Sequence, residues 1–234
     1  MRGVLGQGLD ALGVDLTGEG TLGSVIVKPD SRVPFSTPFV QQYLTELMGN
    51  EVQHVWLVRK TIQSLGAQPI ARPELDLMNS FNTIAQEAGI GYSFDPFASE
   101  ANFILAAENF ETVGVTAYRG AAPLLTNKTV ISASAGILAV EAYHSGVLRL
   151  LEFELGPYSR LASDRLAGLR TLLTANPAIM EQGVVFGGWP NLVPTDGNAL
   201  PFARTPREVL NINYGVRNAP SGGFFPNGVN GTIR

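Results

Sequence analysis

Two copies of one short pattern, Glu51-x-x-His54 and Glu141-x-x-His144, contain both histidines of the 234-residue chain. Each copy falls in an apolar stretch of helical period, where residues three positions apart share one face of a helix. A carboxylate and an imidazole placed in this way can bind the same metal ion. Some four-helix bundles hold a pair of iron or manganese ions through Glu-x-x-His on two helices and a single Glu on each of the other two. The spacing therefore predicts a metal site of this kind.

The first copy requires a long helix that turns its metal-binding face inward. Ser36-Thr37-Pro38 predicts the start, because a hydroxyl residue can cap a helix and proline fits the first turn. The helix should run to about Gly66. A solvated surface pair is the alternative, but ionisable groups are rarely buried without a partner or an ion, and here both lie on the apolar stripe. The stripe has steps of three and four residues and consists of Leu47, Glu51, His54, Val58 and Ile62.

The second copy lies in the middle of another apolar seam. Asn127 or Thr129 can cap a helix that should run to about Leu155. Two polar side chains at the centre of such a seam destabilise the fold unless something satisfies them, and a metal ion would do so. The seam consists of Ile137, Glu141, His144, Leu148 and Leu151.

A single glutamate on a third helix is the further ligand candidate. This helix should begin at Ser99 and run to about Arg119, and Glu111 is central on its apolar stripe. For Glu108, at the flank of the stripe, we expect a solvated side chain. Tyr118 lies near the end of the stripe, where an aromatic residue is more typical of the core than of a redox partner.

The remaining segments are mostly connections. Residues 1–35 are rich in glycine and should be irregular, with a helical turn at 2–5 and one apolar run at 25–27. Prolines and glycines interrupt residues 67–97, where a short helix over 80–88, capped by Asn79, is expected. A fifth amphipathic helix should span residues 158–175.

From residue 176 onward glycine and proline dominate, apart from a short helix over 206–214 capped by Thr205. The stretch still carries large apolar residues, which are Phe186, Trp189, Phe224 and Phe225. A disordered segment would have fewer of them, so we expect residues 176–234 to pack on the bundle or on a partner. We accordingly divide the chain into a helical unit at 1–175 and an extension at 176–234.

The composition excludes several classes of function. The chain has no cysteine, so any metal must be bound by oxygen and imidazole. A net charge of −4 leaves no basic field for nucleic acid, and no apolar run is long enough to span a membrane. Charged residues make up 15% of the chain, well below the usual quarter. This low charge density predicts self-association or contact with another protein chain.

Several motifs, in order along nearly the whole chain, resemble the ferritin-like domain of the desiccation-related protein family. They are Glu51-Val-Gln-His54, Phe94-Asp95-Pro96-Phe97, residues 110–118, Gly120-Ala121-Ala122-Pro123, residues 139–144, Arg204-Thr205-Pro206 and residues 222–228. The resemblance implies an all-α, ferritin-like four-helix bundle with a carboxylate and histidine site. It also implies an exported protein, periplasmic or extracellular, and a link to drying stress.

Carried over by position, the resemblance implies five metal ligands. They are Glu51, His54, Glu111, Glu141 and His144. Such bundles have a first helix that supplies one more Glu, and here residues 1–5 match only the last turn of that helix. We therefore expect the first bundle helix to be missing or truncated in this chain. Three explanations stay open: the chain starts further upstream, the site lacks a ligand, or another chain inserts a helix.

Two functions fit these patterns. One is an iron or manganese site, with one or two ions, that handles oxygen or peroxide. Glu111 and Glu141 would then bridge or chelate, and Glu51, His54 and His144 would be terminal ligands. The other is a non-catalytic structural or protective bundle that assembles with itself or with other proteins. A hydrolase has little support, because the chain has no Gly-x-Ser-x-Gly motif.

Overall fold

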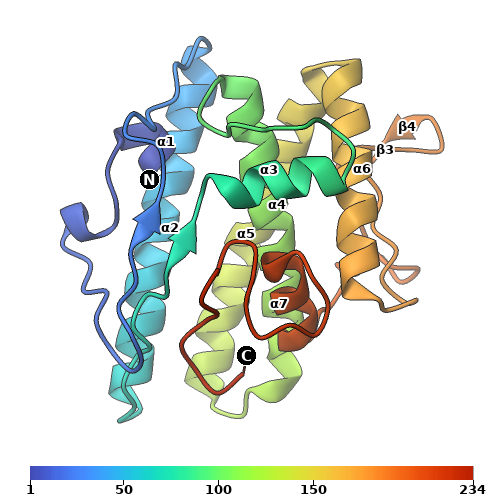
Figure 1. Ribbon diagram of the computed structural model, residues 1–234. Helices are drawn as coiled ribbons and strands as arrows, with labels where there is room; N and C mark the ends of the chain where they lie inside the picture. Colours follow the sequence, from blue (N-terminus) through green and yellow to red (C-terminus); the bar gives the residue numbers. More distant parts are fainter. Residues whose placement is uncertain (234) are drawn as a thin grey trace.

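Three long helices run side by side in the computed structural model, which describes residues 1–233 (Figure 1). They are α2 (Pro38–Ser64), α4 (Glu100–Ala121) and α5 (Lys128–Glu154). The two Glu-x-x-His patterns lie in α2 and α5, and Glu111 lies in α4. The predicted ends of these three helices agree with the observed ends to within two residues. The all-α architecture expected from the sequence is thus confirmed. No helix in residues 1–233 has the length and apolarity needed to cross a membrane.

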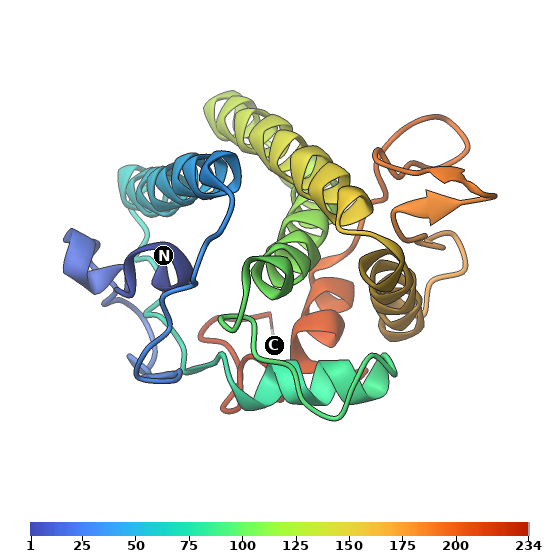
Figure 2. The ribbon, with the colours of Figure 1, turned by 90° about the horizontal axis from the view of Figure 1, so that it is seen from above.

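Shorter elements surround these helices. The helices are α1 (Arg2–Leu5), α3 (Asn79–Glu87), α6 (Pro157–Thr174) and α7 (Pro206–Tyr214), with 3-10 turns at Asp10–Leu12 and Ala122–Leu124. The strands are β1 (Val25–Ile26), β2 (Leu75–Asp76), β3 (Val185–Phe186) and β4 (Trp189–Pro190). Seen from above, α3 crosses one side of the bundle, while α6 and the β3–β4 hairpin lie on the side away from α2 (Figure 2).

The helix starts are fixed by capping groups, two of which differ from the prediction. Asn127 caps α5 and Thr205 caps α7 as expected. Thr37 begins α2 without a side-chain cap, because the carboxylate of Glu100 accepts the backbone N–H groups of residues 36 and 37 instead. The cap of α3 comes from Asp76, not Asn79, since Asp76 accepts the N–H groups of residues 78 and 79. A carboxylate stabilises a helix N-terminus because that end of the helix carries a partial positive charge.

The apolar core binds α2 to the other long helices at one end. Val4, Val40, Leu44, Ile104 and Leu148 are all buried in one cluster that joins α1, α2, α4 and α5. A second cluster joins α4, α6 and α7. Towards the other end of α2, Val58 is 37% exposed, so the predicted apolar stripe does not stay in the core along its whole length.

A short parallel pairing of β1 with β2 joins the irregular segment before α2 to the connection after α2. The sequence did not predict it, although the apolar run at 25–27 was noted. Gly23 lies beside this pair so closely that a Cβ would come within 2.1 Å of the Glu74 backbone nitrogen. Only glycine allows this approach.

The last part of the chain packs on the helices. Phe224 is 2% exposed, and its ring centroid lies 5.1 Å from that of Phe81 and 4.9 Å from that of Phe110. The β3–β4 hairpin differs, because Phe186 and Trp189 are 63% and 77% exposed. Two aromatic residues of the extension thus remain free on the surface of this chain.

A network of buried ion pairs fastens the extension to α4, α5 and α6. Glu108 is 1% exposed and accepts from Arg149 at 3.1 Å, so the expectation of a solvated Glu108 was wrong. Arg149 also donates to the carbonyl oxygens of residues 182, 183 and 191. Burial is possible because each of the two paired glutamates, Glu108 and Glu181, contacts two arginines. The network consists of Glu108, Glu181, Arg149, Arg170 and Arg204.

Replacing Arg149 with Met should destabilise the fold by roughly 3–5 kcal/mol, because breaking a buried ion pair leaves a charge without its partner. Urea unfolding followed by circular dichroism measures the loss. Arg217 is exposed, and Arg217→Met should change the unfolding free energy by less than about 0.5 kcal/mol. A loss below about 1 kcal/mol for Arg149→Met, the usual effect of a single substitution, would show that the network is dispensable.

Candidate metal centre

The structure brings all five predicted residues together between α2 and the pair formed by α4 and α5. Glu51 and His54 come from α2, Glu111 from α4, and Glu141 and His144 from α5. The i, i+3 spacing places both members of each pattern on the same face, as predicted. Their role as ligands remains a prediction.

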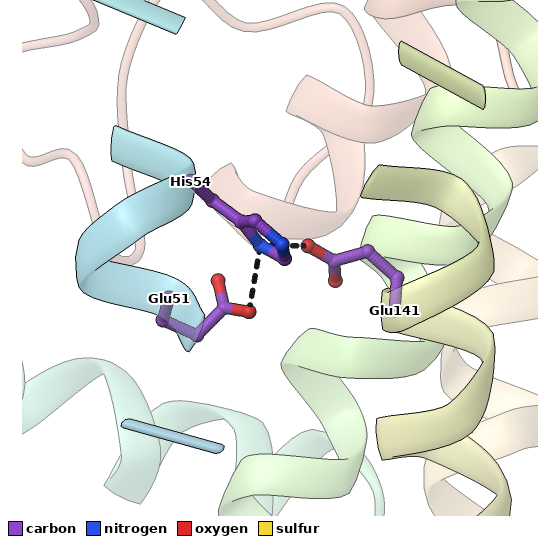
Figure 3. A group of neighbouring side chains, drawn as sticks. All are labelled: Glu51, His54 and Glu141. Carbon is purple, nitrogen blue, oxygen red and sulfur yellow. Dashed lines mark ion pairs between the residues drawn. The ribbon is translucent and has the colours of Figure 1, made fainter. Parts of the chain in front are cut away.

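One half of the cluster is formed by Glu51, His54 and Glu141 (Figure 3). The Nδ1 atom of His54 lies 3.0 Å from Oε1 of Glu51 and 3.4 Å from Oε1 of Glu141. The three side chains point toward one another across the space between α2 and α5. Two carboxylates and one imidazole thus converge from two helices.

The other half is formed by Glu51, Glu111 and His144. Nδ1 of His144 lies 3.3 Å from Oε1 of Glu51 and 3.2 Å from Oε2 of Glu111. In each half the candidate ligand atoms lie within 4.8 Å of one another. Glu51 belongs to both halves, and the two imidazole ring centroids are 6.3 Å apart.

Two of these atoms are buried without a hydrogen bond. Oε1 of Glu51 and Nδ1 of His54 have no hydrogen-bond partner within residues 1–233, although they lie close to each other. Buried polar atoms are normally satisfied, so each exception requires an explanation. A cation between the two would satisfy both. Iron and manganese accept carboxylate and imidazole ligands, and the residues present therefore fit such an ion.

The charges of the cluster do not balance. Three glutamates face two histidines, and within the described part of the chain no Lys or Arg forms an ion pair with any of the three. In the buried network around Glu108, by contrast, Glu108 and Glu181 each pair with two arginines. A buried negative charge without compensation is costly. The cluster must therefore take up protons or a cation.

Protons resolve the imbalance when no metal is bound. Burial, together with the charges of Glu111 and Glu51, raises the pKa of Glu141 to about 9. Burial also raises the pKa of Glu111, which accepts a hydrogen bond from the Glu141 carboxyl. The two carboxyl groups thus share a proton at neutral pH, as expected for like charges held close together.

The imidazole of His144 takes up another proton. Burial alone would lower its pKa, but the hydrogen bond to Glu111 and the nearby charges of Glu111 and Glu51 outweigh burial and raise the pKa to about 9. A metal ion must displace this proton, because imidazole binds metals in its neutral form.

The surroundings include residues that the sequence did not single out. Asn50 contacts Nε2 of His144 through its amide at 3.2 Å, and the hydroxyl of Tyr43 donates to the His144 carbonyl at 3.1 Å. Such contacts orient a metal-binding imidazole. Gly114 of α4 faces Glu141, and a Cβ there would come within 2.4 Å of Oε2 of Glu141. The only sequence signal for Tyr43, Asn50 and Gly114 is their position relative to the two Glu-x-x-His patterns and to Glu111.

An open pocket of about 360 Å³ reaches the cluster from outside. Glu51, His54 and Tyr118 line it, together with Arg59 and Arg72. Burial and the charges of Glu141 and Glu51 raise the pKa of Tyr118 to about 12, so its hydroxyl keeps its proton at neutral pH. Tyr118 therefore faces the candidate site and not only the core.

The chain is similar to two known proteins over nearly its whole length. Along 254 aligned positions, the chain is 29% identical to "Ferritin-like catalase Nec2" from Nesocodon mauritianus, covering 99% of this chain and 78% of that protein. It is 27% identical to "Desiccation-related protein PCC13-62" from Craterostigma plantagineum, covering 94% of this chain and 73% of that protein. No solved structure gives a significant match. The family model described as "Ferritin-like domain" matches residues 17–154, which include all five predicted ligands, and the chain belongs to this ferritin-like family.

Proposed function

We propose that the cluster binds one or two iron or manganese ions and that the protein uses them to break down peroxide. The observation that carries this proposal is the unbalanced set of three glutamates and two histidines, three of them buried and Glu51 and His54 half-buried, with two orphaned polar atoms facing each other. In the adjacent network, by contrast, Glu108 and Glu181 are each paired with two arginines. Similarity to a protein named as a ferritin-like catalase supports peroxide as the substrate.

The geometry supports a division of the ligands between two positions. His54 and Glu141 would serve one, Glu111 and His144 the other, and Glu51 would be shared because it belongs to both groups. The sequence pattern suggested instead that Glu111 and Glu141 would bridge or chelate. We favour Glu51, since its Oε1 lies within 3.3 Å of both imidazole Nδ1 atoms.

The side chains around the cluster have definite tasks in such a reaction. A bound iron or manganese ion would supply electron exchange with peroxide. The pocket beside Glu51 admits a molecule of this size, and the protonated hydroxyl of Tyr118 can donate a hydrogen bond to it. Two peroxide molecules would give two of water and one of dioxygen, so the residues need only exchange protons. Glu141 can hold such a proton.

A second candidate function is protection without turnover. Similarity to a desiccation-related protein supports it, and so does the hairpin that exposes Phe186 and Trp189. Exposed apolar patches often mark contacts between proteins. In this alternative the ions would be structural, and the hairpin would bind a second copy of the chain.

Replacing His144 with Ala should remove most of the bound metal, because one half of the cluster loses its imidazole. We expect the wild type to hold up to about two equivalents of iron or manganese, as a full site of this type would. Metal content by mass spectrometry and dioxygen release from hydrogen peroxide are the two measurements. Glu154→Ala, an exposed change on the same helix, is the control. Full metal content in His144→Ala would refute the site, and bound metal without dioxygen release would favour protection.

Replacing Gly114 with Ala should weaken metal binding while keeping every ligand, because the new methyl group displaces the Glu141 carboxyl. Alanine also favours helix over glycine by about 1 kcal/mol, so thermal stability should not fall. Gly146→Ala is the matched control, since a Cβ there meets nothing within 4 Å. Calorimetric titration with manganese compares the variants. Equal affinity in both would show that the close approach of α4 has no role in binding.

The metal-free protein should lose stability as pH rises. The pKa values of Glu141 and His144 are raised from 4.5 and 6.5 to about 9, so the folded state binds more protons than the unfolded state between these values. Their contribution is complete below pH 4.5 and is lost as pH approaches 9. Glu141→Gln keeps a neutral group and should be more stable than the wild type at high pH. Urea unfolding in the presence of a chelator measures both profiles, and a flat wild-type profile would contradict the assignment.

A further inference from the structure

Asn50 precedes the candidate ligand Glu51 on α2, and its side chain reaches across to a histidine of α5. The amide group of Asn50 lies 3.2 Å from Nε2 of His144. The other ring nitrogen, Nδ1, lies 3.3 Å from Oε1 of Glu51 and 3.2 Å from Oε2 of Glu111. The two nitrogens of His144 thus have different neighbours, with an amide on one side of the ring and the candidate metal ligands on the other.

The second histidine of the cluster is held less firmly. Nδ1 of His54 lies near Glu51 and Glu141 without a hydrogen bond, and no amide contact holds this ring within residues 1–233. His54 and Glu51 also line the open pocket of about 360 Å³. Glu111 and His144 are only 6% and 3% exposed. The two halves of the cluster therefore differ in how well their imidazoles are fixed and in how open they are.

An amide beside Nε2 decides which nitrogen of the ring can bind an ion. A neutral imidazole that binds through Nδ1 carries its proton on Nε2, and in a buried place this proton needs an acceptor. In the structure the amide nitrogen of Asn50 faces Nε2, and half a turn about the last side-chain bond brings the amide oxygen into the same place. Asn50 can therefore accept from Nε2 of His144 and leave Nδ1 free beside Glu111.

The charge of the cluster limits how two ions can fill it. Its three glutamates offer at most three negative charges. A first divalent ion neutralises two of them, so a second ion meets only one and binds more weakly. Binding also becomes weaker when ligands must first be ordered, so the half whose imidazole is already fixed has the higher affinity. These two effects together predict that the half containing His144 fills first.

We propose that Asn50 is a positioning residue, which holds Nδ1 of His144 toward Glu111 and makes this half of the cluster the first and tighter of two ion positions. The half formed by His54 and Glu141 then takes the second ion more weakly, next to the open pocket. The inference rests on the metal binding of the proposed function and deepens it, because it gives the two halves unequal roles. It does not depend on peroxide as the substrate.

Calorimetric titration of the metal-free protein with manganese tests the order of binding. The wild type should show two steps of different affinity. Asn50→Leu keeps the volume but removes the acceptor, so it should weaken the tighter step by about ten- to a hundredfold, as loss of such a partner usually does, and leave the weaker step unchanged. Gln53→Leu, an exposed change on the same helix, should alter neither step.

The possible failures of this titration are distinguishable. A single step in the wild type, or an unchanged tight step in Asn50→Leu, would overturn the role of Asn50 and leave metal binding intact. No binding of manganese by the wild type would overturn the proposed function as well.

A spectroscopic measurement separates positioning of the ring from a general effect on stability. The chain has only two histidines, so nitrogen NMR of histidine-labelled protein with bound zinc, a diamagnetic ion that imidazole also binds, shows only two rings. The ring of His144, identified by its absence in His144→Ala, should carry its proton on Nε2 and exchange it slowly with water. Asn50→Leu should exchange faster, whereas Asn50→Asp keeps an acceptor oxygen and should restore slow exchange. Equal exchange in all three proteins would overturn the proposal.

Discussion

The structure depends on how it neutralises three carboxylates that meet two imidazoles between α2 and the α4–α5 pair. Carboxylates in a poorly hydrated place repel one another, so protons or cations must compensate them. Without metal, Glu141 and His144 hold protons at neutral pH, and their pKa values of about 9 reflect this. Metal binding would replace these protons. Protonation thus lets the fold tolerate the cluster without a metal, and in the proposed function the same groups would become ligands once the protons leave.

Helix α4 carries two buried glutamates, and each has a different environment. Glu108 faces α5 and α6, where Arg149 and Arg170 neutralise it. Glu111 faces His144 and lies near Glu51, and no arginine pairs with it in the described residues. The Glu108 network also holds the backbone of residues 182–191. The Glu108 side of α4 is therefore held by ion pairs, whereas on the Glu111 side the protonation state can change.

Much of this was predictable from the sequence. The long helices followed from periodicity, and the two Glu-x-x-His patterns met in space because they lie at similar depths on neighbouring helices. The resemblance to the desiccation-related proteins is confirmed by the match to one of them and to the ferritin-like family. Glu108 was misjudged because its partner Arg149 is 41 residues away, and periodicity does not reveal which distant residue faces a charge. The β1–β2 pairing and the approach of Gly114 to Glu141 are long-range contacts of the same kind.

The cluster also bears on how α2 is held. The first half of α2 shares an apolar core with α1, α4 and α5. In its second half Leu57 and Val58 are exposed, and so is Leu65 just after the helix ends. The Glu51 and His54 contacts lie at the boundary between these halves. An ion bound there would join α2 to α4 and α5 beyond the apolar cluster that these helices share. Metal affinity and the docking of α2 are then linked, because ligands from separate helices converge only when those helices are packed together.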